Sequence, residues 1–490
     1  MSKPLGTIKK IQEKKPIDIP LNIFWGVFAI YTIAVFIGVN VHEPWRDEAQ
    51  AWLLVRDLNL AGLFKTLPSE GHPPLWYLLI MPLAKCSLPY ISQNYLAAII
   101  MIATVYILIF KTKLPDLLKL ALPFSYFFFY EYAVLARSYC LVAFFITLII
   151  WLYPKRFEKP WLFAACVIGL FNTHMLTFGF ATALTVLFYL DARKQGKLKQ
   201  VIPALAIMTI GGMYLIPYLA FSAMARAEQM HALDHTTRII NTITGSTIID
   251  GSSIWGTLLF LLAALTLLKT TKPLLLLIFG AAGVFYILAY RYNLADTRHY
   301  GVLFTILIGS YALREYYVGD SWNIIRAVPL SQYAHWSFIV MIALQLPQTF
   351  TRYKADVEKD FSGAKATAEF LTDNNLQNKI WVGHQAWAAS AILPYVPAKK
   401  IYYPECARYG TYYVYDSCYL QNRWAMMPEQ AADITLKNMK DSIANIIFIF
   451  NYPLRSKTAK YLDMIYHSPE VSIKKDETFY VYKFKQTLKQ

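Results

Sequence analysis

Long apolar segments separated by short basic stretches constrain the fold of this chain more than any other feature. The first segment, residues 22–39, is long enough to span a bilayer and lacks a small-residue cleavage site. Of the 490 residues, 56% are hydrophobic and 16% are charged, which is too apolar for a soluble protein of this size. The sequence therefore predicts a polytopic α-helical membrane protein.

Basic residues set the predicted orientation of the chain. They concentrate in the N-terminal tail and in the loops that the positive-inside rule places in the cytoplasm. This placement accounts for the net charge of +16, and no zinc-finger, P-loop or RNA-binding motif is present, so nucleic acid is not expected as a partner. We expect a multi-pass protein of the cell inner or plasma membrane with a cytoplasmic N-terminus.

Eleven membrane spans are expected. The segment 73–84 has only about twelve residues, too few to cross, so we expect a juxtamembrane or re-entrant helix there. This choice also keeps the later basic loops in the cytoplasm. The spans are expected near residues 22–39, 90–110, 117–134, 138–153, 160–174, 176–190, 200–221, 254–269, 273–290, 299–317 and 328–347.

The chain changes character after residue 351, where charge rises and apolar runs shorten. Runs of strand length begin at Ile380, Asn445 and Thr478, and a helical pattern covers residues 354–372. We therefore expect a small α/β domain on the extracytoplasmic side. The predicted domains are a cytoplasmic basic tail (1–21), a transmembrane domain (22–351, with its first outer loop at 41–89) and this extracytoplasmic domain (352–490).

Two of the five cysteines, Cys406 and Cys418, lie in the C-terminal domain around an aromatic-rich loop. An oxidising compartment would allow them to pair, and so short a loop would stabilise the domain by roughly 3 kcal/mol. Two separate thiols are equally compatible with the sequence.

An acidic pair, Asp47 and Glu48, opens a helical pattern (residues 48–60) in the first outer loop, as expected of a helix lying in the membrane interface. Carboxylates beside a bilayer are costly and usually functional. Asp47 could instead cap this helix, but we favour a functional role for it. For Glu48 the structural role is favoured, with substrate binding as the alternative.

Three cationic or protonatable side chains are predicted near the same face. Arg137 lies at one outer turn, and Arg298 and His299 lie at another. An arginine fork suits a phosphate because it is planar, permanently charged and bidentate. The alternative is that each arginine extends to the lipid headgroups.

Other candidates are weaker. His72 before the Pro-Pro pair could contact substrate, and His174 at a predicted helix end is more simply a packed histidine. Lys65, Glu70 and Glu131 could also reach a cavity on this face. His231, Asp234 and His235 have a spacing that can bind a metal, although a solvated surface explains them better.

These residues resemble a known family. An Asp-Glu-Ala run beginning at Asp47, a His-Pro-Pro-Leu run beginning at His72, and Arg137 at a later outer turn are similar to the GT-C fold membrane glycosyltransferases. Within these the chain resembles the bacterial branch related to protein O-mannosyltransferases and lipid A aminoarabinose transferases. The likeness covers residues 1–190, and Arg137-Ser138-Tyr139 departs from the Arg-Pro-Asp that relatives often carry.

The resemblance implies an inverting transfer of a sugar from a polyprenyl-phosphate donor to a glycan, lipid or protein acceptor. Asp47 would be the general base, and Arg137, together with Arg298 and His299, would meet the donor phosphate. Glu48 and His72 are further substrate-binding candidates from their positions in the sequence. No cofactor is certain, and a divalent metal stays open because no closed ligand set is visible. A transporter of lipid-linked saccharide and a non-catalytic envelope assembly protein are the alternatives.

Overall fold

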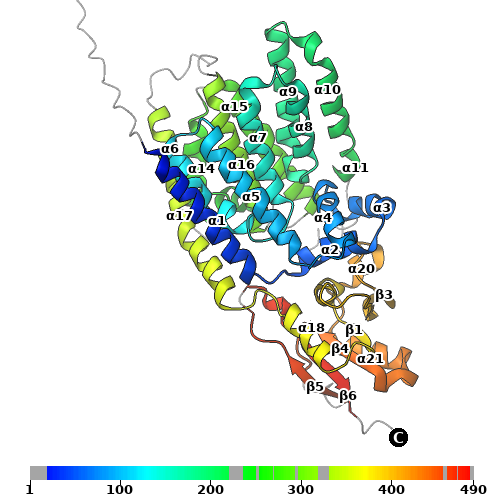
Figure 1. Ribbon diagram of the computed structural model, residues 1–490. Helices are drawn as coiled ribbons and strands as arrows, with labels where there is room; N and C mark the ends of the chain where they lie inside the picture. Colours follow the sequence, from blue (N-terminus) through cyan, green and yellow to red (C-terminus); the bar gives the residue numbers. More distant parts are fainter. Residues whose placement is uncertain are drawn as a thin grey trace, which may run out of the picture.

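A bundle of long helices is joined at one end to a smaller domain built on a β-sheet (Figure 1). The computed structural model describes residues 19–219, 235–249, 253–268, 270–292, 296–317, 330–455, 461–471 and 473–485. Most of the basic tail and the candidate metal residues His231 and Asp234 lie outside the described residues.

Each range predicted as a span contains a helix. By length and composition, five helical stretches of the described chain could cross a membrane: Leu21–Val41, Ser92–Lys111, Met175–Lys194, Leu198–Leu219 and Thr271–Ala289. The total of eleven spans therefore stays a prediction. The long helices are α1 (Leu21–Val41), α5 (Ser92–Lys111), α7 (Tyr139–Leu152), α8 (Pro160–Phe171), α9 (Phe178–Lys194), α10 (Leu198–Met213), α14 (Ser253–Leu265), α15 (Thr271–Tyr286), α16 (Thr297–Leu313) and α17 (Leu330–Glu358).

The bundle is held by close helix contacts, one of which joins α9 and α15. At this crossing Gly179 and Gly283 face each other, and a Cβ at Gly179 would lie 2.3 Å from the Phe279 carbonyl oxygen. Small residues at a crossing allow two backbones to approach closely in membrane helices. Shorter helices join the long ones: α11 (Ile216–Leu219), α13 (His235–Gly245), η3 (Tyr153–Lys155), η4 (Met175–Thr177), η6 (Ile287–Tyr292) and η7 (Arg314–Tyr317).

The prediction of a single helix over residues 117–134 was wrong, because this segment is not one continuous helix. The chain instead makes α6 (Asp116–Ala121), the 3-10 turn η1 (Leu122–Phe124) and the π-helix η2 (Phe127–Glu131). Pro123 lacks a backbone donor, and the Ser125 hydroxyl donates to the Leu122 carbonyl (2.9 Å), which ends the first helix. The break brings the turn before Arg137 to the end of the bundle that faces the sheet domain.

The segment predicted as the first outer loop (41–89) folds into three short helices, α2 (Arg46–Asp57), α3 (Leu60–Glu70) and α4 (Leu75–Lys85). The single helix expected to Leu60 is interrupted because the Asn59 side chain caps α3, accepting from Gly62 N at 2.8 Å. Helix α2 does not lie in an interface with one face exposed. Residues 48–55 are all buried, because α4 packs on one side and η9 (Ser390–Ile392) of the C-terminal domain packs on the other.

Helix α17 runs through the predicted boundary at 351/352, so charge rises there because the helix leaves its apolar surroundings, not because it ends. The helical pattern 354–372 is split, with α17 ending at Glu358 and α18 (Ala364–Asp373) following. The C-terminal helices and turns are α19 (Ala386–Ala389), η9, η10 (Pro404–Cys406), α20 (Ser417–Asn422), α21 (Pro428–Asn438), η11 (Lys440–Asn445) and η12 (Lys475–Glu477).

Six strands of the described chain form one mixed sheet in the order β3-β2-β1-β4-β6-β5. Strand β1 is parallel to β2 and β4, with Val382 opposite Phe448, and the other neighbours are antiparallel. The strands are β1 (Ile380–Gly383), β2 (Ile401–Tyr403), β3 (Arg408–Gly410), β4 (Ile446–Phe450), β5 (Leu462–His467) and β6 (Tyr480–Phe484). The small α/β domain predicted from the sequence is therefore present.

Candidate active site

A cavity of about 430 Å³ lies where the first outer loop, the starts of α7 and α16, and the C-terminal domain meet. Six residues predicted from the sequence line it: Asp47, Glu70, His72, Arg137, Arg298 and His299. Residues not predicted also line it: Arg46, Gln50, Tyr77, Tyr139, Asp296, Trp387, Tyr413, Tyr415, Tyr419, Arg423 and Trp424. The cavity therefore gathers side chains separated by more than 300 positions in the chain.

Asp47, in the first turn of α2, is at the centre of the cationic part of this cavity. Its Oδ2 lies 2.9 Å from Arg298 Nη2, and Arg137 Nη1 donates to its backbone carbonyl oxygen. The Arg298 guanidinium also lies over the Trp45 ring, 5.1 Å from its centroid. The Asp47 side chain remains 16% exposed, so its carboxylate is paired but still reachable from the cavity.

The charges around Asp47 control its protonation. Burial alone would raise the pKa of Asp47, but Arg298, followed by Arg137, Arg46 and Lys474, outweighs burial and lowers the pKa to about 2. In the free protein this carboxylate is therefore ionised at any physiological pH, and it is a weak base.

Arg137 connects Asp47 to a group of histidines. Its Nη2 donates to His72 Nε2 at 3.3 Å, which requires this imidazole nitrogen to be unprotonated. Burial and then Arg137 lower the pKa of His72 well below its usual range, in agreement with that hydrogen bond. His174, which does not line the cavity, is buried behind it and stacks on Tyr139 with ring centroids 4.8 Å apart.

The start of α16 presents Arg298 and His299. Asp296 caps this helix, accepting from Thr297 N (2.8 Å), while His299 Nδ1 accepts from Asp296 N (2.9 Å). Asp296 Oδ2 also pairs with Arg298 Nη1 at 3.1 Å. His299 thus has a capping role besides its place on the cavity wall, and Arg298 is held between the carboxylates of Asp47 and Asp296.

Glu48 does not line the cavity, so its position agrees with the favoured structural role and not with the alternative of substrate binding. Its side chain is fully buried. It accepts from Asn94 Nδ2 and Ala136 N, both at 2.6 Å, and from Trp45 N at 3.0 Å. His42 Nε2 lies 3.1 Å away as a further partner. With so many partners, Glu48 ties α2 to α1, α5 and the turn before Arg137.

The three remaining candidates differ in whether they reach the cavity. Glu70 lines the cavity and accepts from Gln50 Nε2 at 3.0 Å. Burial raises the pKa of Glu70 to about 8, so its carboxyl is largely neutral at pH 7. Lys65 is exposed on α3 and does not reach the cavity. Glu131 lies in an adjoining cavity of about 160 Å³, where Tyr126 donates to it at 2.7 Å.

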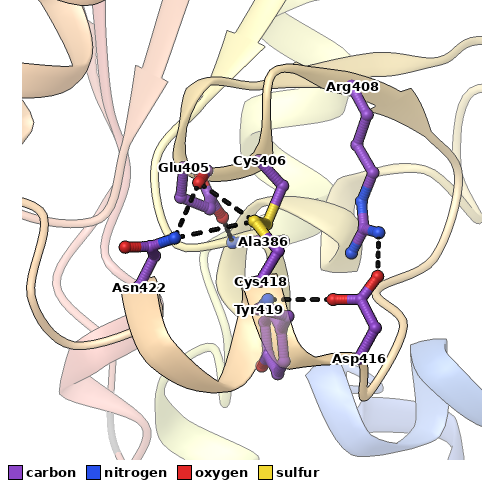
Figure 2. The surroundings of a disulfide bond; sticks show 8 residues. All are labelled: Ala386, Glu405, Cys406, Arg408, Asp416, Cys418, Tyr419 and Asn422. Carbon is purple, nitrogen blue, oxygen red and sulfur yellow. Dashed lines mark hydrogen bonds and ion pairs between the residues drawn. A yellow bond between two sulfur atoms is a disulfide. The ribbon is translucent and has the colours of Figure 1, made fainter.

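The structure joins Cys406 and Cys418 in a disulfide, with Cα atoms 5.9 Å apart (Figure 2). An Arg408–Asp416 ion pair lies beside it, and Asp416 Oδ1 accepts from Tyr419 N at 2.9 Å. The closed loop carries Tyr413 and Tyr415, two of the aromatic side chains that line the cavity. Sequence reasoning noted that this loop is rich in aromatic residues but did not place it at the site.

The arrangement combines the accessible carboxylates of Asp47 and Asp296 with several guanidinium groups, which suits it to binding an anion beside a proton acceptor. Arg46 adds to this set, with Nη1 2.7 Å from Asp476 Oδ2 and 3.2 Å from Glu477 Oε1. Among the described residues, no cluster of three or more His, Cys, Asp or Glu side chains is arranged to hold a metal ion.

No family model and no curated protein match the sequence. Among solved structures, the chain is similar to the cryo-EM structure of the arabinofuranosyltransferase AftD from mycobacteria, with a TM-score of 0.37 and 12% identity. The match covers 95% of this chain and 40% of that one, so the chain spans well under half of the other protein's length. A likeness this distant identifies neither a family nor a reaction.

Proposed function

We propose that this chain is an integral membrane glycosyltransferase that moves a sugar from a polyprenyl-phosphate donor to an acceptor on the outer face of the membrane. The observation that carries the proposal is the Asp47 carboxylate, held beside Arg137 and Arg298 in one cavity. The resemblance of the Asp47 and His72 motifs to the GT-C fold glycosyltransferases supports the same conclusion.

The arginines are suited to the donor phosphate. Arg137 and Arg298 offer planar, permanently charged donor forks, and the prenyl chain would remain in lipid among the helices. Both arginines contact Asp47 in the free protein, so a bound phosphate would compete with Asp47 for them. As the bond to the sugar breaks, the same groups would stabilise the charge on the departing lipid phosphate.

In the proposed step, an acceptor hydroxyl oxygen forms a bond to the anomeric carbon while the bond from that carbon to the phosphate oxygen breaks. The electron pair of the broken bond stays on the phosphate oxygen, and the acceptor proton passes to Asp47. A single displacement from the opposite face inverts the anomeric centre.

Competition for the arginines also couples donor binding to the strength of the base. With a pKa of about 2, Asp47 is too weak a base to remove a hydroxyl proton efficiently. A bound phosphate would offset the positive charge that lowers this pKa, and the pKa would rise. Asp47 would thus become an effective base only when the donor is present.

A metal ion forms no part of the proposal. Arg46, Arg137, Arg298 and Lys474 already surround Asp47 with positive charge. Repulsion from these groups would oppose the approach of a divalent cation to the carboxylate.

The test is the release of polyprenyl phosphate and the transfer of sugar by the purified protein, with envelope lipids and glycans as acceptors. We expect Asp47→Asn to lower the transfer rate about 10²- to 10⁴-fold while donor binding persists, because only the proton acceptor is lost. Asp57→Asn is the matched control, because Asp57 lies at the far end of the same helix, paired with Arg56.

Two results would refute the proposal. Equal transfer by the wild type and Asp47→Asn would exclude Asp47 as the base. If the wild type releases no sugar but moves a lipid-linked saccharide between leaflets, the chain is a transporter.

A further inference from the structure

The two sides of the cavity differ in chemistry. The membrane domain contributes Asp47 and most of the charged groups, together with Tyr77 and Tyr139, whereas the C-terminal domain contributes five aromatic rings and Arg423. We define the aromatic wall as the five rings that line the cavity from this domain: Trp387, Tyr413, Tyr415, Tyr419 and Trp424. In Figure 1, α20, which carries Tyr419, lies beside α2 at the end of the bundle that faces the sheet domain.

The rings of the aromatic wall are pre-arranged by contacts with one another, and Trp424 is the exposed member, whereas Trp387, Tyr413 and Tyr419 are largely buried. Tyr413 and Tyr419 are stacked, with centroids 5.3 Å apart, and Tyr415 meets both edge-on. Trp387 and Trp424 are inclined at 53° with centroids 5.4 Å apart, and Trp424 is 62% exposed. Trp424 therefore gives the wall an accessible aromatic ring that borders the cavity.

The wall is fixed relative to Asp47. Gln50, one helical turn after Asp47 in α2, donates to the Tyr413 carbonyl oxygen (2.9 Å) and accepts from Tyr413 N (3.3 Å). Glu405, next to the disulfide, accepts from Ala386 N at 2.8 Å and so ties the loop to the helix that carries Trp387 (Figure 2). A ligand resting on these rings would therefore lie at a set distance from the proposed base.

Polar groups border the rings. The Arg423 guanidinium lies 5.6 Å from the Trp424 centroid, and the Arg46 guanidinium lies 4.4 Å from that of Trp387. Glu70 lines the same cavity and, as a neutral carboxyl group, can both donate and accept a hydrogen bond. The ligand that fits has an apolar face for the rings and hydroxyl groups around its edge.

Sugar rings have this character, since their C–H groups pack on aromatic faces while their hydroxyl groups form hydrogen bonds. A prenyl chain would leave the polar groups unsatisfied. An extended peptide would need free backbone groups to pair with, and Gln50 already occupies those of Tyr413.

We propose that the acceptor is a glycan and that the aromatic wall, with Trp424 as its exposed ring, is its binding subsite. Identifying the bound glycan as the acceptor rests on the proposed function. Glycan binding itself can be measured without transfer. The C-terminal domain would then select the acceptor, and the membrane domain would hold the donor.

The test measures binding of arabino-, manno-, galacto- and gluco-oligosaccharides of two to six units to the full chain, by saturation-transfer NMR and tryptophan fluorescence. It uses both the wild type and Asp47→Asn, so that a failure of the transfer reaction does not affect the result. We expect at least one series to bind, and Trp424→Ala to weaken its binding about tenfold. Trp424→Phe should recover part of the loss.

Two controls accompany this measurement. Tyr461→Ala removes a ring that is 49% exposed in the same domain and does not line the cavity, and it should leave oligosaccharide binding unchanged. The affinity for sugar-free polyprenyl phosphate should be the same in Trp424→Ala as in the wild type. The inference is overturned if no oligosaccharide binds, or if Trp424→Ala weakens polyprenyl-phosphate binding and spares that of the oligosaccharide.

Discussion

Asp47 and Glu48 are consecutive residues with opposite surroundings. Glu48 is fully buried and accepts three hydrogen bonds from Trp45, Asn94 and Ala136, with His42 as a further partner. Asp47 faces a cavity and is paired with Arg298. Neighbouring carboxylates on one helix therefore have different expected roles, one in holding the fold and one in chemistry.

The contrast extends beyond the two residues. Behind Glu48, His42 Nδ1 lies 2.8 Å from Asp356 Oδ2, and Tyr130 donates to the same oxygen at 3.0 Å. Burial alone would lower the pKa of His42, but Asp356 and Glu48 outweigh it and raise the pKa to about 10. The imidazolium is thus enclosed between two carboxylates, and this network fixes the end of α1 to α2 and α17. Asp47 lies on the other side, where a ligand can exchange for its partners.

Breaking the buried network should give the largest effect on stability. We expect Glu48→Gln to lower the free energy of unfolding by about 3 to 5 kcal/mol, because it leaves the His42 imidazolium with one buried carboxylate instead of two. Unfolding of the purified protein in denaturant measures this change. Asp47→Asn is the comparison variant and should change stability much less, since Asp47 borders the cavity. Equal losses in the two variants would remove the distinction between them.

Replacing Arg298, the ion-pair partner of Asp47, tests the chemical role expected of Asp47. We expect Arg298→Gln to slow transfer about 10²- to 10³-fold, because a donor to the departing phosphate is lost. Arg298 is also the strongest of the charges that lower the pKa of Asp47, so the acid limb of kcat/KM should move to higher pH.

Arg193→Gln is the matched control for this variant, because Arg193 is exposed in the last turn of α9, away from the cavity. A loss of transfer in Arg298→Gln without a shift of the pH profile would mean that Arg298 acts on the donor alone and does not set the protonation of Asp47.

Much of the fold followed from the sequence because membrane helices and buried strands have a local signal. The runs at Ile380, Asn445 and Thr478 correspond to β1, β4 and β6, and the first two of these strands are almost wholly buried. Strands β3 and β5 were missed because most of their residues are partly or fully exposed, and β2 because it has only three residues. Such strands are defined by the neighbours with which they pair.

The candidate site was predictable on one side only. Asp47, Arg137 and Arg298 stand out because charge beside an apolar segment is costly, and all three line the cavity. Charge alone does not show which way a side chain faces, which is why Lys65 was counted among the weaker candidates and substrate binding was kept as the alternative for Glu48, although neither residue lines the cavity. The aromatic wall was missed because aromatic residues are common in any core, and nothing local shows that the loop around Tyr413 contacts Gln50, 363 positions earlier.

A third carboxylate, Glu70, lies between the two extremes and gives the smallest predicted effect. It is buried like Glu48 yet lines the cavity like Asp47, and burial raises its pKa to about 8 despite the hydrogen bond from Gln50. In the unfolded chain a glutamate ionises near its usual pKa of about 4.3. The folded form is therefore favoured at low pH, and stability falls as pH rises from there through 8.

Glu70→Gln keeps the hydrogen bond from Gln50 but cannot ionise, so it should lose this part of the pH dependence. We expect equal stability of wild type and variant near pH 4, and a variant more stable by about 2 kcal/mol at pH 6. Thermal unfolding across this range measures the difference. Burial also raises the pKa of Glu43 to about 8 and that of Glu477 to about 7, so the variant should keep a shallower slope of the same sign. Parallel curves of stability against pH for the wild type and Glu70→Gln would mean that Glu70, like Asp47, is ionised in the folded protein.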